Sequence, residues 1–98
     1  MSVKIKTSPQ SKDEVLGYSV DFASVMDVAE TIDTVTITHI PPEGSTMTPL
    51  TITGTIAGTI VYFDVGQLVE LGLHRIQVLA NLNTTHKPEI ELDIDVLW

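Results

Sequence analysis

Residues 89–96 read Glu-Ile-Glu-Leu-Asp-Ile-Asp-Val, and this stretch decides the fold class. Four apolar residues alternate with four acids, and side chains alternate between the two faces of a β-strand. The pattern therefore predicts a strand with one apolar face and one anionic face. Leu97 and Trp98 follow directly, so we expect the domain to end with this strand.

The same alternation recurs along the chain. The expected strands cover about residues 3–7, 16–23, 31–40, 50–56, 60–65, 74–82 and 89–96. Glycine, proline and polar clusters separate them at the short intervals typical of two-sheet folds. We predict an all-β fold, an antiparallel two-sheet β-sandwich of immunoglobulin-like type with about seven strands, forming a single domain over residues 1–98. The chain has no cysteine, so it lacks the disulfide of antibody domains.

Three local features follow from the pattern. Lys4 and Lys6 alternate with apolar residues and suit an edge strand, whose pairing with other chains lysine discourages. The slip between Ile32 and Val35 predicts a β-bulge or a later start of that strand. Segment 15–29 fits both helical and strand spacing. Because Gly17 weakens a helix, we expect a strand at 16–23 and then a loop or a single helical turn through 24–29.

Composition and charge restrict the function classes. Thirteen acids against five bases give a formal charge of -8, which argues against nucleic acid and anionic membranes as partners. This charge favours solubility or a basic partner. Residues 1–6 lack the apolar region of a secretory signal, and the longest apolar run, 60–63, is too short to cross a bilayer. We expect the protein to be made in the cytoplasm.

The acids of residues 89–96 form the main candidate interaction face. They are Glu89, Glu91, Asp93 and Asp95. If Leu82 pairs with Ile90 across a turn at 83–88, the row lies opposite Asn83, Asn81, Leu79 and Gln77 in that order. No base on that side then neutralises it directly, although Arg75 could reach Asp95 diagonally.

Two interpretations of this acidic row stay open. It can dock a basic partner, or it can be a solvated face whose charge discourages edge-to-edge aggregation, the more common reason for such a pattern. Calcium binding is disfavoured, because calcium needs six to eight ligands gathered by a flexible loop and a strand spreads its carboxylates out.

Other site chemistry finds little support in the sequence. His39, His74 and His86 share no metal-binding spacing, and we expect them to be unrelated surface or half-buried residues. No cysteine, nucleophile elbow or phosphate-binding glycine loop is present. The sequence therefore predicts no catalytic residues, no metal site and no cofactor.

Several segments together resemble a group of small phage virion proteins with immunoglobulin-like folds. The resemblance spans about residues 17–97 and is carried by 18–22, 30–32, 54–61, 71–72, 76–80, Glu89 and 94–96. One departure is His86-Lys87-Pro88, where the group often has a glycine.

The resemblance implies a non-enzymatic virion structural protein. Such a subunit acts as a fibre-to-tail adaptor or a decoration protein and assembles on capsid, neck or tail proteins, with symmetric homo-oligomers as the expected form. The alternative is a small carbohydrate- or ligand-binding sandwich. Such modules usually present several exposed aromatic residues, whereas this chain has five aromatic residues, most of them expected in the core.

Overall fold

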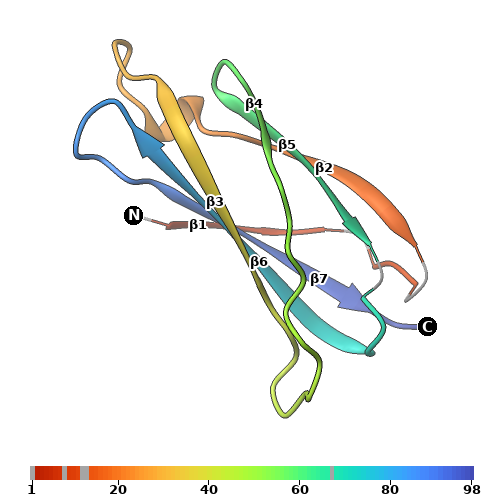
Figure 1. Cartoon of the computed structure of the whole chain (residues 1–98). Coiled ribbons are helices and arrows are strands. Elements are labelled where there is room, and N and C mark those ends of the chain that lie inside the picture. The colour runs from red at the N-terminus through yellow and green to blue at the C-terminus, as the bar shows by residue number, and fades with distance from the viewer. Residues whose placement is uncertain (1, 8, 12–13, 67) are drawn as a thin grey trace.

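A computed structural model describes residues 2–7, 9–11, 14–66 and 68–98 of the chain. It contains two packed β-sheets and one short 3-10 helix (Figure 1). The elements are β1 Ser2–Lys6, β2 Val15–Asp21, η1 Ala23–Val25, β3 Ile32–Ile40, β4 Thr55–Ala57, β5 Ile60–Gly66, β6 Gly72–Leu82 and β7 Glu89–Val96. One sheet has the order β1-β7-β6-β3 and the other β2-β5-β4. The predicted all-β sandwich of about seven strands is confirmed.

The strand orders are those of an immunoglobulin-like sandwich. In that fold the third, sixth and seventh strands share one sheet, and the second, fifth and fourth strands share the other. The first strand departs from the predicted antiparallel arrangement, because β1 pairs with β7 in parallel. Parallel neighbours need a long connection, and these two strands lie at opposite ends of the sequence. As predicted, β1 is an edge strand, and its Lys4 and Lys6 side chains are 64% exposed.

The core lies between the sheets and is filled by alternate residues of the strands. Burial of one large apolar side chain contributes about 1.5–3 kcal/mol, so this alternation supplies most of the driving force. The buried apolar residues are Val20, Phe22, Ile32, Val61, Phe63, Val65, Leu68, Ile76, Val78, Ala80, Leu82, Ile90, Leu92, Ile94 and Val96.

Two predictions near the N-terminal half are confirmed. The register between β3 and β6 shifts between Ile32 and Thr34, where the bulge was expected. Segment 15–29 forms strand β2 followed by the single helical turn η1.

The hairpin between β6 and β7 has a different register from the predicted one. Leu79 lies opposite Glu89, Gln77 opposite Glu91, Arg75 opposite Asp93 and Leu73 opposite Asp95. The reason is that residues 86–88 extend the ladder instead of forming the turn. The Ala80 N–H donates to the Pro88 carbonyl at 3.0 Å and the Leu82 N–H to the His86 carbonyl at 3.4 Å.

The predicted strand at 50–56 is also divided. Thr51 bridges Thr38 of β3, whereas residues 55–57 form β4 on β5 of the opposite sheet. The segment therefore changes sheets, and Gly54 lies at the crossing. A Cβ added there would lie 2.9 Å from Ile37 Cδ1 and 3.1 Å from Val61 Cγ1, so the backbone passes close to both sheets.

We predict that Gly54→Val destabilises the protein by about 1–3 kcal/mol, because the added atoms overpack the crossing. Ala57→Val, at an exposed position of β4, is the matched control and should change stability by less than about 0.5 kcal/mol. Urea unfolding measures both. Equal stabilities of the two variants would contradict a close crossing at Gly54.

Candidate functional site

The acidic row lies on the outer face of β7, as the alternation predicted. The neighbouring strands are β1 on one side and β6 on the other. The row is not freely exposed: Glu91 is 6% exposed, and Glu89, Asp93 and Asp95 are half-buried. Carboxylates this close to the protein interior need charged or hydrogen-bonding partners.

Bases from both neighbouring strands supply those partners. Lys4 Nζ lies 3.8 Å from Glu91 Oε2 and Lys6 Nζ 2.6 Å from Asp95 Oδ2. Arg75 Nε lies 3.7 Å from Glu91 Oε1 and 3.8 Å from Asp93 Oδ1. The expectation that no base on the β6 side directly neutralises the row is therefore wrong, because Arg75 lies opposite Asp93 in the observed register. The lysines of β1 lie on the other side of β7, which that expectation did not cover. That the row docks a partner stays a prediction.

Two of the three histidines meet inside the sandwich. His39 of β3 and His74 of β6 are 2% and 0% exposed, and their rings stack with centroids 5.1 Å apart. His39 Nε2 lies 2.9 Å from His74 Nδ1. The expectation of unrelated histidines is wrong for this pair, because it ignored the pairing of β3 with β6. His86 lies on the exposed hairpin, with its Nδ1 3.4 Å from Glu30 Oε1.

The hydrogen bonds around the pair assign its protons. The Leu50 N–H donates to His39 Nδ1 at 2.9 Å, so His39 carries its proton on Nε2 and donates it to His74 Nδ1. His74 then carries its proton on Nε2 and donates it to the Glu70 carbonyl at 2.8 Å. Both imidazoles are neutral in this network, and all four ring nitrogens are used.

This histidine relay clamps the segment before β4 onto the sheet. It fixes Leu50, and the Ser45 hydroxyl donates to the Glu70 carboxylate a few residues away. Because every ring nitrogen is engaged, neither histidine is available as a base for Ser45. Among the described residues, no three His, Cys, Asp or Glu side chains gather to hold a metal ion.

Burial and the neighbouring His74 lower the pKa of His39 to about 4. Desolvation is the larger cause, since it penalises the charged imidazolium. The folded protein therefore favours the neutral relay. Protonation of His39 at Nδ1 would place its N–H against the Leu50 N–H, so that two donors would face each other.

Segments that carry exposed apolar side chains meet at one end of the sandwich. Gly72 pairs with Val96, so Leu71 and Leu97 flank the same pair, and Figure 1 shows the C-terminus beside the connection from β5 to β6. Pro42 lies next to Gly72, which brings the end of β3 to the same place. We call this surface the apolar end: Ile40, Val69, Leu71, Leu97 and Trp98, which are 37%, 58%, 58%, 57% and 61% exposed.

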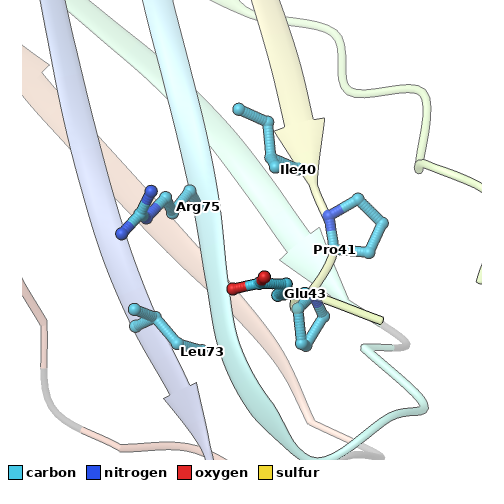
Figure 2. A pocket seen from close by; sticks show the side chains of 6 residues that line it. Ile40, Pro41, Glu43, Leu73 and Arg75 are labelled. Carbon is cyan, nitrogen blue, oxygen red and sulfur yellow. The ribbon is translucent and has the colours of Figure 1, made fainter. Parts of the chain in front are cut away.

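A hollow of about 460 Å³ adjoins the apolar end (Figure 2). Ile40, Pro41 and Glu43 come from the end of β3 and the turn after it, whereas Leu73 and Arg75 come from β6. Its wall combines apolar carbon with one cation and one carboxylate. Sequence alternation could not reveal this hollow, since it depends on how the turn at 41–44 lies beside β6.

The aromatic residues do not form a sugar-binding platform in the described chain. Tyr18 stacks with Phe63 at a centroid distance of 6.0 Å, and Phe22 is fully buried. Tyr62 and Trp98 are exposed, but they lie on the outer face of β5 and after β7 respectively. In the part of the chain that the structure describes, no helix is long and apolar enough to span a membrane.

We predict that acid weakens the fold through His39. Folding lowers its pKa from 6.5 to about 4, so the unfolded chain binds more protons between these values and stability falls as pH falls. The stabilising contribution of neutral His39 is fully present above pH 6.5. It is lost progressively as the pH falls to 4, and the free energy of unfolding decreases by at most about 3 kcal/mol. Unfolding free energy measured by urea titration across this range checks the slope.

His39→Asn should flatten this slope, because asparagine keeps an acceptor for the Leu50 N–H without titrating. His86→Asn, on the exposed hairpin, is the control and should keep the slope of the wild type. Backbone hydrogen bonds also lower the pKa values of Asp21 and Glu30, but their contributions are lost only below the ordinary values of 3.8 and 4.5. His39→Asn leaves both groups unchanged, whereas His86→Asn removes a minor cause of the lowered Glu30 pKa, so the slopes are compared above pH 4.5. An unchanged slope in His39→Asn would contradict the neutral relay.

Comparison with models of protein families finds no match to this chain, and comparison with curated proteins finds none. The functional proposal therefore starts from the geometry described above.

Proposed function

We propose that this chain is a non-enzymatic structural subunit of a phage virion, an adaptor or decoration protein that assembles on capsid, neck or tail proteins. The resemblance of residues 17–97 supports the virion setting, and the immunoglobulin-like sandwich fits it. The apolar end is the single observation that carries an assembly role.

The apolar end has the composition of a docking surface. Five of the nine large apolar side chains that are exposed in the described chain lie there. Scattered apolar residues are normal on a surface, whereas a concentration of them at one end of a domain favours an interaction site. Tryptophan, here Trp98, is among the residue types that carry most of the binding energy in interfaces.

The hollow beside this end provides shape and polarity. A partner side chain that enters it would meet Ile40, Pro42 and Leu73 as apolar contacts. Arg75 and Glu43 lie at the same wall and can orient polar groups of the partner. Recesses of this kind, with an apolar lining and few polar groups, are where anchoring side chains of a partner are bound.

The acidic row takes a different part in this proposal. Its carboxylates face Lys4, Lys6 and Arg75 of the same chain, so much of their charge is already compensated. The remaining net negative charge keeps the subunit soluble and steers it towards a basic surface, while the apolar end makes the contact.

We predict that Leu71→Asp weakens binding to the virion partner at least tenfold, because it places a charge in the centre of the apolar end. Val28→Asp is the matched control, since Val28 is fully exposed on the loop after η1, and it should leave binding unchanged. The experiment coexpresses the chain with the proteins encoded beside its gene, identifies the copurifying protein and measures its affinity by calorimetry. A capsid, neck or tail protein is expected.

Equal losses of affinity in the two variants would contradict the apolar end as the contact. Copurification with no virion protein, together with binding of a soluble glycan, would overturn the assembly role.

A further inference from the structure

Strand β2 has an open edge. It forms the border of the three-stranded sheet and, among the residues that the structure describes, pairs with β5 alone. The Phe22 N–H donates to the Thr59 carbonyl at 2.8 Å, and this bond shows which residues of the strand direct their backbone groups towards β5. In an antiparallel pair, alternate residues direct both backbone groups towards the partner. The even-numbered residues of β2 therefore face β5, and residues 15, 17, 19 and 21 direct their N–H and C=O groups outward.

The other sheet borders are protected. At the border of the four-stranded sheet, β1 presents Lys4 and Lys6, which discourage strand addition. Thr51 bridges the free side of β3, and β4 has only three residues. In contrast, β2 has seven residues with no lysine, proline or bulge in its pairing with β5. Among the residues described, nothing covers its outward backbone groups.

The inner side chains of β2 also remain incompletely covered. Leu16 and Tyr18 point towards the core but are half-buried, whereas Val20 on the same face is 2% exposed. A strand added to this edge would cover both residues and pair the outward backbone groups. The required occupant is thus an extended strand.

The sequence of β2 is complementary to itself in the antiparallel direction. A two-fold axis at Tyr18 places Gly17 opposite Ser19 and Val15 opposite Asp21. All four residues with outward backbone groups then pair with one another. Gly17 and Ser19 face each other beside the axis, and the two Tyr18 residues lie opposite each other on it. Asp21 is the only charged residue of the strand, and it lies opposite Val15 of the other copy, away from the second Asp21. In a chain of net charge -8, this pairing therefore brings only one charged side chain from each strand to the interface.

We propose that two copies of this chain dimerise by antiparallel pairing of their β2 strands about a two-fold axis at Tyr18. The two three-stranded sheets become one continuous sheet, and the interface is isologous. The proposed dimer relates to the assembly role in one respect: it names a second copy of this chain as one of the partners. The dimer forms from the purified chain alone, and its surface is separate from the apolar end.

The first test is sedimentation velocity of the full chain over a concentration series. We expect a monomer–dimer equilibrium whose dissociation constant rises at least tenfold in Ser19→Pro, because proline removes an outward N–H and leaves the bonds to β5 intact. Ser19→Ala is the matched control and should dimerise like the wild type. If Ser19→Pro does not fold, Ser19→Lys tests the same edge through repulsion between neighbouring lysines.

The second test fixes the register. Because the chain has no cysteine, Gly17→Cys and Ser19→Cys variants mixed under oxidising conditions should form a disulfide-linked heterodimer. Directly paired strand residues have Cα atoms about 5.5 Å apart, a spacing that a disulfide can bridge. Ala57→Cys on β4 mixed with Gly17→Cys is the control and should give far less disulfide-linked heterodimer.

A monomer at every concentration would overturn the proposal, as would a dimer that persists in both Ser19→Pro and Ser19→Lys. Leu71→Asp distinguishes the two proposals. This variant should leave the dimer intact while it lowers the affinity for the virion partner. A dimer that is lost in Leu71→Asp but kept in Ser19→Pro would assign self-association to the apolar end.

Discussion

The row of acids on the outer face of β7 is the constraint that the arrangement of this sheet has to satisfy. β7 lies between β1 and β6, and its inner face supplies Ile90, Leu92, Ile94 and Val96 to the core. Its outer face therefore brings four carboxylates into the middle of a sheet, spaced about 7 Å apart along one strand. Such a row is unfavourable unless bases lie beside it.

The position of β1 follows from this constraint. In parallel register, Lys4 lies opposite Glu91 and Lys6 opposite Asp93, so both lysines reach the carboxylates of the row. Arg75 does the same from β6. The one departure from an antiparallel sandwich thus places positive charge where the sheet requires it. With β1 on this sheet, the opposite sheet ends at β2, which leaves that strand open for self-pairing.

Alternation in the sequence predicts most of the strands, because burial of one face decides the spacing of apolar residues. It also predicts the bulge near Ile32 and the edge position of Lys4 and Lys6. It cannot predict features that depend on register. Pro88 has the chemistry of a turn residue, yet its carbonyl extends the β6–β7 ladder, and this shifts every cross-strand partner of the acidic row.

The histidine relay escapes sequence reasoning for the same reason. His39 and His74 are 35 residues apart, and only the pairing of β3 with β6 brings them together. The apolar end likewise combines residues from the end of β3, the β5–β6 connection and the residues after β7. Its members have no pattern in sequence, so an exposed leucine there looks like any other surface residue.

Bases of the same chain hold the acidic row, and the contacts proposed with partners lie on other surfaces. A double-mutant cycle with Arg75→Gln, Glu91→Gln and the double variant tests it most directly, by unfolding free energies in low salt. We predict a favourable coupling of about 1 kcal/mol that shrinks as salt increases. A coupling of zero would contradict this account, and the carboxylates of the row would then be interpreted as facing solvent or binding a partner.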